Sequence, residues 1–307
     1  MPAPIFKCIL NNKIMHCGIM LEELRTFVLL GEEGSIQKVA RRLPLTQPAV
    51  SRQIQRLEQR LGLVLLDRRQ KPPVLTPVGV EVQARGREIL NAFEDLKALG
   101  KAHEPGGVFR LGLVNGVAHT RLAETIVAIA ARFPRVTMRL KSGWSADLAE
   151  QHRLGLLEAA IILADGSRFY DARPIGKESL IAVGASERMK ELGKPSEPRW
   201  VLSPEPCDAR RALASRLARE GRPLIVAAEI EHAGLQMGLI REGIGLGLMP
   251  RRLYEQERPP GIEEVDALEG GLRLDVLMLR APHLGPHAKI ADAVEAEVRR
   301  FIAGNLS

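Results

Sequence analysis

The chain has 307 residues, a formal net charge of +7 and a pI near 9.6, and this length predicts two or three domains. Hydrophobic residues make up 45% and charged residues 26%, which excludes a disordered or fibrous protein. The positive charge favours an anionic partner but does not identify one.

The apolar runs are too short for a membrane span, and residues 1–19 make a poor signal peptide. The three cysteines, Cys8, Cys17 and Cys207, form no CxxC pair, so we expect no disulfide framework and favour the cytoplasm. Ordered patterning begins at Met20. We therefore interpret residues 1–19 as an extension that is disordered or precedes the native start.

Closely spaced helices are predicted from Met20 onward, where apolar residues recur at spacings of three and four. A second helix follows over 36–43 with Ser35 as its N-cap. Thr46 can cap a third helix, which Gly62 ends. Two short helices joined by a tight turn describe a helix-turn-helix within residues 35–62.

The outward side of the third helix carries groups that suit base edges and phosphates. Residues 36–71 hold nine basic and two acidic side chains, so the basicity of the chain is concentrated there. The alternative is a solvated helical bundle. We expect DNA contacts from Ser35, Gln37, Thr46, Gln47, Pro48, Ala49, Ser51, Arg52, Gln53, Gln55, Arg56, Arg68 and Arg69.

A hairpin and a long helix follow the helix-turn-helix. Strands over 64–66 and 74–76 flank a basic turn, and we expect this wing to place Arg68 and Arg69 against the phosphate backbone. A helix capped by Thr76 continues to about residue 99. Its thin apolar stripe predicts pairing with a copy of itself, and hence a dimer.

Residues 20–79 carry a specific run of motifs. They are Ala40-Arg41-Arg42-Leu43, Gln47-Pro48-Ala49-Val50-Ser51-Arg52-Gln53-Ile54, Leu57-Glu58, Leu61-Gly62 and Leu75-Thr76-Pro77-Val78-Gly79. This run resembles the LysR-type transcriptional regulators. Two departures, Pro44 in the turn and Pro72-Pro73 in the wing, stiffen the backbone without removing a contact residue.

The resemblance implies an N-terminal all-α winged helix-turn-helix with a long linker helix. It also implies a C-terminal α/β two-lobed effector domain that is similar to periplasmic binding proteins. The implied partners are double-stranded DNA, a small-molecule effector such as an organic acid or aromatic compound, further copies of the chain as a dimer or tetramer, and RNA polymerase.

The rest of the chain alternates strand-like and helix-like stretches, which predicts an α/β fold with a largely parallel sheet. We expect a DNA-binding domain over 20–77, a linker helix over 78–99, a hinge over 100–107 and an effector domain over 108–307. Its lobe I comprises 108–181 and 276–307, and its lobe II comprises 182–275.

Three loops that join strands to helices are candidates for the effector site, because free backbone N–H groups gather there. The candidate residues are Asn115, Gly116, Val117, Ser142, Gly143, Trp144, Ser145, Glu229 and His232. Ser145 would cap the helix that begins at Ala146. Trp144 either stacks on a ligand or fills the core.

Other motifs carry little chemistry. The resemblance implies that the glycine-rich Gly243–Gly247 is a buried turn and strand. A dinucleotide-binding loop is disfavoured, because no strand directly precedes it and no acidic residue is placed for a ribose. Cys207 alone is a weak candidate for redox sensing. No His spacing suits a metal and no Ser/His/Asp grouping suits a nucleophile. We therefore expect no enzyme, metal or cofactor.

The leading hypothesis is a sequence-specific DNA-binding regulator whose activity a small molecule changes by binding between two lobes. A solute-binding protein is one alternative, but it leaves the basic first eighty residues unexplained. An architectural DNA-binding protein without an effector is the other.

Overall fold

The computed structural model describes residues 20–98, 104–117, 122–166, 172–185 and 197–303. The chain divides into two compact units. The N-terminal unit comprises residues 1–104, 153–156 and 281–286, and the C-terminal unit comprises the remainder. The predicted extension over 1–19 and residues 100–103 of the predicted hinge lie outside the described residues.

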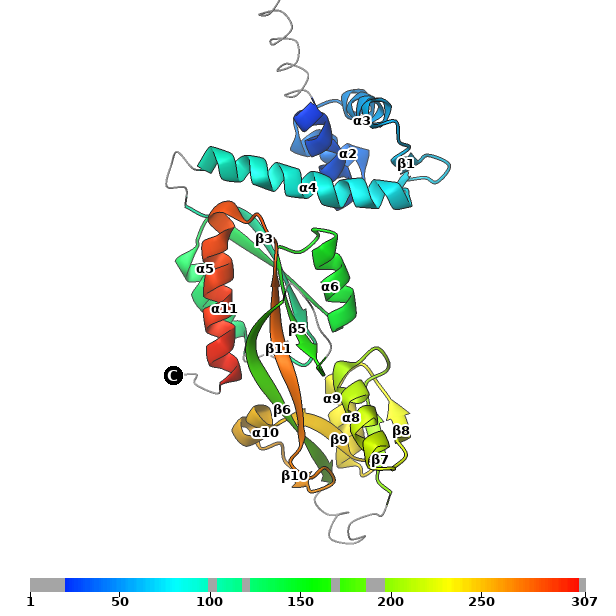
Figure 1. Ribbon diagram of the computed structural model, residues 1–307, viewed down its shortest axis with the longest axis vertical. Coiled ribbons are helices and arrows are strands. Elements are labelled where there is room, and N and C mark those ends of the chain that lie inside the picture. Colours follow the sequence, from blue (N-terminus) through cyan, green and yellow to red (C-terminus); the bar gives the residue numbers. More distant parts are fainter. Residues whose placement is uncertain (1–19, 99–103, 118–121, 167–171, 186–196, 304–307) are drawn as a thin grey trace, which may run out of the picture. The chain divides into compact units, whose positions relative to one another are not determined.

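The N-terminal unit contains the predicted helix-turn-helix, wing and long helix (Figure 1). A first helix spans residues 20–33, α2 spans Ile36–Arg42 and α3 spans Gln47–Leu61. Strand β1, Leu66–Asp67, pairs antiparallel with β2, Val74–Leu75, and α4 spans Pro77–Ala98. The first strand begins later than predicted, at Leu66, and the Glu58 carboxylate accepts hydrogen bonds from the Leu65 and Leu66 amides at its start.

The three predicted cap residues of this unit, Ser35, Thr46 and Thr76, all stand at the starts of their helices. Thr46 Oγ1 accepts a hydrogen bond from the Ala49 amide at 3.3 Å, and Thr76 Oγ1 accepts one from the Gly79 amide at 3.0 Å. Ser35 stands at the N-cap of α2, but its side chain makes no capping hydrogen bond. The prediction that Ser35 is the N-cap residue of α2 is therefore confirmed, although its side chain does not contribute a hydrogen bond.

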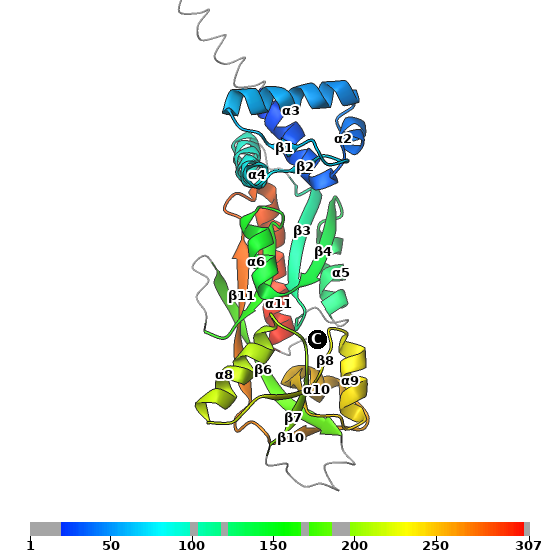
Figure 2. The same cartoon turned by 90° about the vertical axis from the view of Figure 1, so that its right-hand side faces the viewer.

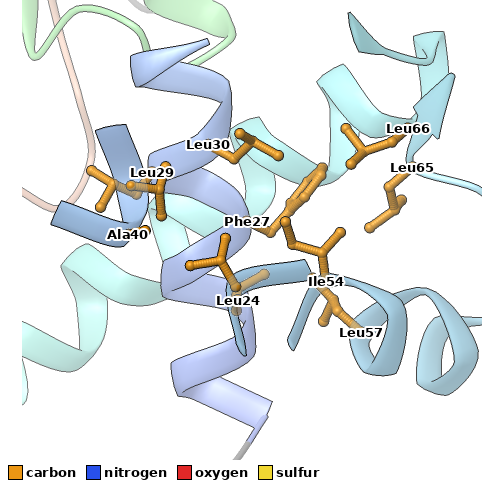
Figure 3. Packing of buried hydrophobic residues seen from close by; sticks show 11 residues of the cluster. Leu24, Phe27, Leu29, Leu30, Ala40, Ile54, Leu57, Leu65 and Leu66 are labelled. Carbon is orange, nitrogen blue, oxygen red and sulfur yellow. The ribbon is translucent and has the colours of Figure 1, made fainter. Parts of the chain in front are cut away.

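An apolar cluster packs the helices and the wing together. Figure 3 shows Phe27 of the first helix facing Ile54 of α3, with Leu65 and Leu66 of the wing close by. Phe27 is fully buried, and burying one such side chain stabilises the fold by about 2–3 kcal/mol. The position of α3 therefore depends on contacts with the first helix and with the wing.

Helix α4 packs one side against the first helix and leaves another side open. A Cβ at Gly86 would lie 2.7 Å from Leu24 Cδ1, so a larger residue at this position would require Leu24 of the first helix to shift. Ile89, Phe93 and Leu96 are 52%, 40% and 65% exposed on α4. This apolar stripe has no cover within the described part of the N-terminal unit.

The C-terminal unit is built on a seven-stranded sheet in the order β10-β6-β11-β5-β3-β4, with β9 also paired to β6. The strands are β3 Gly107–Val114, β4 Val136–Gly143, β5 Ala159–Ala164, β6 Arg173–Ala185, β9 Gly247–Pro250, β10 Ile262–Val265 and β11 Leu272–Arg280.

The sheet is mixed, so the prediction of a largely parallel sheet is wrong. Only β3 makes parallel pairs, with β4 and β5, while the other pairings are antiparallel. Only residues 165–172 separate β5 from β6. That is too short for the helical crossover that a parallel return requires.

Helices cover both faces of the sheet. The helices α5, Leu122–Arg132, and α11, Ala288–Ile302, lie on one face, and α6, Ser145–Arg153, lies on the other (Figures 1 and 2). A 3-10 turn, Gly285–His287, precedes α11. We call the group formed by β3, β4, β5, α5, α6 and α11 lobe I.

A second group of elements follows β6, and we call this group lobe II. Here β7, Arg199–Leu202, pairs parallel with β8, Ile225–Glu229. The helices are α8 Asp208–Arg219, α9 Ala233–Arg241 and α10 Arg251–Glu257, and lobe II also takes β9 and β10. The predicted lobe boundaries fall inside the long strands β6 and β11, and this division stays a prediction.

A buried ion pair joins α10 to β6. Arg252 Nε donates to Glu178 Oε2 at 2.9 Å, and the guanidinium lies 4.2 Å from the centroid of the Phe301 ring on α11. Burial raises the pKa of the Glu178 carboxyl above its ordinary value, and the attraction of Arg252 opposes this shift. The pair therefore links lobe II to the last helix of lobe I.

Candidate DNA-binding surface and effector site

The outer face of α3 carries polar side chains along its first three turns. Because α3 buries Val50, Ile54 and Leu57 against the core, the positions between them face away from it. Most predicted contact residues of this helix lie together on that face. Gln47, Pro48, Arg52, Gln55 and Arg56 are exposed, and Ala49 and Ser51 are half-buried.

Two arginines on this face are available to an anionic partner. Arg52 and Arg56 make no ion pair with any residue in the described part of the chain. Arg52 Nε donates to the Pro48 carbonyl one turn earlier at 3.3 Å. Arg60, nearer the end of α3, lies 3.4 Å from the buried Glu23 carboxylate instead. The unpaired positive charge of α3 therefore precedes its last turn.

Gln53 does not join the outer face. Its Oε1 accepts a hydrogen bond from the hydroxyl of buried Thr26 at 2.5 Å. Position 53 lies on the side of α3 that faces the first helix. The prediction that Gln53 helps to read bases is therefore not supported by its position, which serves helix packing.

The wing arginines are both paired. Arg68 Nη2 lies 2.6 Å from Glu58 Oε2, and Arg69 Nε lies 3.0 Å from Asp67 Oδ1. The hydrogen bonds from Arg69 hold the pKa of the Asp67 carboxyl below its ordinary value. The Arg69 side chain is 90% exposed. Arg68 is thus part of the internal bonding of the wing, a role that the sequence did not indicate.

Glu58 has a structural role in this unit that the sequence did not indicate. Its carboxylate accepts hydrogen bonds from the Leu65 and Leu66 amides at 2.8 and 3.2 Å in addition to the Arg68 pair. One side chain of α3 therefore fixes the start of the wing. An acidic residue within a strongly basic stretch was the available signal.

The remaining predicted DNA contacts lie where α2, α3 and the wing meet. Gln37 and Thr46 are exposed and Ser35 is half-buried. A cavity of about 200 Å³ is lined by Ser35, Gln37 and Gln47 together with Pro72 and Pro73 of the wing. The wing prolines thus lie beside the first turns of α2 and α3.

Two of the three predicted effector loops are adjacent in the C-terminal unit. Val114 pairs with Gly143 in the parallel register of β3 and β4, and the Asn115 amide donates to the Gly143 carbonyl at 3.0 Å. Asn115, Gly116 and Ser142 are exposed, and Gly143 and Trp144 are half-buried. Val117 is fully buried, so its side chain packs in the core.

The third predicted loop follows β8 in lobe II. Glu229 is paired with Arg210, whose Nη1 lies 2.7 Å from Glu229 Oε1. His232 is exposed, and its Nδ1 accepts a hydrogen bond from the Leu235 amide at 3.1 Å. His232 is therefore the N-cap of α9, with its Nε2 as the N–H nitrogen.

Ser145 occupies a different position from the one predicted. It is the first residue of α6 and not its cap, and it is 1% exposed. Its hydroxyl donates to Asp208 Oδ2 at 2.5 Å and accepts from the Leu163 amide at 3.0 Å. Burial raises the pKa of the Asp208 carboxyl, against the lowering effect of Ser145 and Arg211. The sequence did not indicate this cluster.

The larger cavities lie elsewhere in the C-terminal unit. One of about 760 Å³ is lined by Arg216, Arg219 and Arg273 among others, and one of about 300 Å³ by Arg222 and Asp266 among others. Neither has a predicted effector residue among its described lining residues.

No group of three or more His, Cys, Asp or Glu side chains in the described ranges could hold a metal ion. No helix among the same residues is long and apolar enough to cross a membrane.

Comparison with known proteins agrees with this architecture. A family model described as "Bacterial regulatory helix-turn-helix protein, lysR family" matches residues 21–80, and one described as "LysR substrate binding domain" matches residues 102–296. The chain belongs to the LysR family. It is a DNA-binding transcription regulator with an effector-binding domain, and the matches favour the leading hypothesis over both alternatives.

Individual relatives of this LysR-type regulator cover most of its length. It is 30% identical over 256 residues to the HTH-type transcriptional regulator TfdS of Cupriavidus pinatubonensis, covering 77% of this chain and 84% of TfdS. A full-length OxyR variant of Pseudomonas aeruginosa shares the fold, with a TM-score of 0.74, 20% identity and coverage of 91% and 94%. Full-length LysG of Corynebacterium glutamicum, with bound effector Arg, gives a TM-score of 0.64, 18% identity and coverage of 91% and 97%.

Proposed function

We propose that α3 is the recognition helix of this regulator and that its outer face reads base edges in the major groove. The supporting observation is that Arg52 and Arg56 are exposed on one face and make no ion pair with the described residues. Arginine donates two hydrogen bonds to guanine, and glutamine can do the same with adenine. Gln47 and Gln55 lie on the same face, so both base types can be recognised.

The proposal is tested by Arg52→Ala in the full-length protein. We expect its affinity for an operator duplex to fall roughly 10- to 100-fold, which is the range for one lost bidentate base contact. Affinity for a scrambled duplex should fall much less. Fluorescence anisotropy titrations at one fixed salt concentration give both values.

Arg300→Ala is the matched control, because it removes the same charge from the exposed side of α11. Its ratio of operator to scrambled affinity should equal that of the wild type. If Arg52→Ala also kept this ratio, α3 would not be the reading element.

We further propose that two copies pair through the exposed stripe of α4. Ile89, Phe93 and Leu96 are large apolar side chains spaced at intervals of four and three on one helix, which suits a helix–helix seam. A dimer would offer two recognition helices to two half-sites of an operator. Assembly into a tetramer, contact with RNA polymerase and action in the cytoplasm remain part of this proposal.

For the effector, we propose an organic acid or an aromatic compound bound beside Asn115, Gly143, Trp144 and His232. The adjacency of the first two loops supports this location. Trp144 is half-buried, whereas the other tryptophan, Trp200, is fully buried. Quenching of Trp144 fluorescence in a metabolite screen therefore reports binding at this location. Trp144→Phe should abolish the signal, and a signal that persists would place the ligand elsewhere.

A further inference from the structure

Ser145 and Asp208 meet where lobe I and lobe II face each other. Ser145 begins α6 of lobe I, and Asp208 begins α8 of lobe II. One end of α6 points toward α8 in both views (Figures 1 and 2). The Ser145 hydroxyl donates to Asp208 Oδ2 at 2.5 Å, and the two residues are 1% and 4% exposed. The contact is therefore a dry hydrogen bond between the lobes.

A second bridge lies beside the first. Arg211 Nη2 donates to Asp208 Oδ1 at 2.7 Å, and Arg211 Nε donates to Asp165 Oδ2 at 3.0 Å. Asp165 directly follows β5 of lobe I. Both oxygens of Asp208 are thus occupied, and Arg211 of lobe II connects this carboxylate to one of lobe I.

The single proton of the Ser145 hydroxyl is engaged. It donates to Asp208 and accepts from the Leu163 amide at the end of β5. In this arrangement of the lobes it has no donor left for a ligand. Ser145 therefore makes its donated hydrogen bond between the lobes, and its predicted effector contact stays a prediction.

Burial makes this contact behave as a two-state element. A buried carboxylate that loses its hydrogen bonds is strongly destabilised unless water replaces them. The lobes therefore cannot separate slightly at this point. The contact is either made and dry, or broken with water around Asp208.

We propose that Ser145 and Asp208 form a latch that positions the two lobes, with Arg211 and Asp165 holding the carboxylate of Asp208 in place. Asp208 is then a positioning residue for the effector response. It favours one relative position of lobe I and lobe II, and an effector bound between the lobes acts on that position. This consequence rests on the proposed effector site. The latch itself exists without an effector and is tested without one.

Hydrogen–deuterium exchange of the full-length, effector-free protein tests the latch. Removing a hydrogen bond to a buried charge shifts a two-state equilibrium roughly 10-fold or more. We expect Ser145→Ala to raise exchange at the start of α8 by about this factor. Asp208→Asn should raise exchange at the start of α6 and at Leu163. In the double variant the increase should not exceed that of the stronger single variant.

Glu158→Gln is the matched control. Glu158 is also a nearly buried carboxylate and bonds the Arg110 amide and guanidinium at 2.6 and 2.8 Å, but both residues belong to lobe I. It should raise exchange in β3 and β5 and leave α8 unchanged. Ser145→Thr keeps the hydroxyl, so the protection of the α8 amides should equal that of the wild type.

The latch is refuted if each variant raises exchange only in its own lobe, or if the two single effects add. If Ser145→Ala does not fold, Asp208→Asn has nearly the same shape as the wild-type residue and decides the question by its effect on Leu163. None of these measurements uses DNA or an effector. A failure of the latch is therefore distinct from a failure of the proposed DNA reading or effector site.

Discussion

Removing the Glu58 side chain should loosen the wing far more than removing its partner Arg68. Glu58 Oε1 accepts from the Leu65 and Leu66 amides at 2.8 and 3.2 Å, and Oε2 accepts from Arg68 Nη2 at 2.6 Å. Glu58→Ala leaves both amides without this acceptor at the point where the chain enters β1. Arg68→Ala removes only the ion pair.

The magnitudes follow from these contacts. Each lost amide bond costs about 1–1.5 kcal/mol. The ion pair adds about 0.5 kcal/mol, since a pair whose arginine is 46% exposed is screened by solvent. Glu58→Ala should therefore destabilise this region by roughly 3 kcal/mol, and Arg68→Ala by roughly 0.5 kcal/mol.

Native-state hydrogen exchange at the Leu65 and Leu66 amides measures the local opening free energy directly. Protection should fall by roughly two orders of magnitude in Glu58→Ala. It should barely change in Gln59→Ala, the neighbouring exposed position on α3. Equal losses in Glu58→Ala and Arg68→Ala would refute the assignment, because the backbone bonds would then contribute nothing beyond the ion pair.

Two further predictions concern α4 and the buried pair of the C-terminal unit. Phe93→Asp places a charge in the exposed α4 stripe and should shift the protein toward monomer in sedimentation velocity. The control Glu88→Ala on the same helix should cause no such shift. An unchanged sedimentation coefficient for Phe93→Asp would show that α4 is not the interface. The pKa of Glu178 is raised in the folded chain, so folding favours its protonated form and the stability it contributes falls as pH rises through the folded pKa. Thermal unfolding of Glu178→Gln should therefore depend less on pH above the ordinary glutamate pKa than that of the wild type, and an identical pH dependence would contradict the assigned shift.

The local elements were predictable because their signals lie close together in the chain. The spacing of Val50, Ile54 and Leu57 placed α3, and Thr46 marked its start. The same spacing gave the outward positions, including Arg52 and Arg56. Helical periodicity thus fixed most of the predicted DNA-binding face.

The contacts that the sequence did not indicate join residues far apart in the chain. Gln53 has an amide side chain that suits a base contact. It instead bonds the hydroxyl of Thr26, which lies 27 residues earlier. Ser145 lies in a loop that the sequence assigns to the effector. Its partner Asp208 lies 63 residues later, so the sequence around Ser145 does not reveal this contact. The strand order also depends on β11 inserting between β5 and β6. Periodicity within one segment carries no information about such pairs.

The inward and outward sides of α3 have separate roles, and this separation has a consequence for evolution. Its inward side chains hold the fold, while Gln47, Arg52, Gln55 and Arg56 are exposed and contribute little to packing. Substitutions at exposed positions usually change stability by no more than about 0.5 kcal/mol. Under the proposed role of α3, substitutions at these four positions would therefore change the DNA sequence that is bound without requiring a more stable fold.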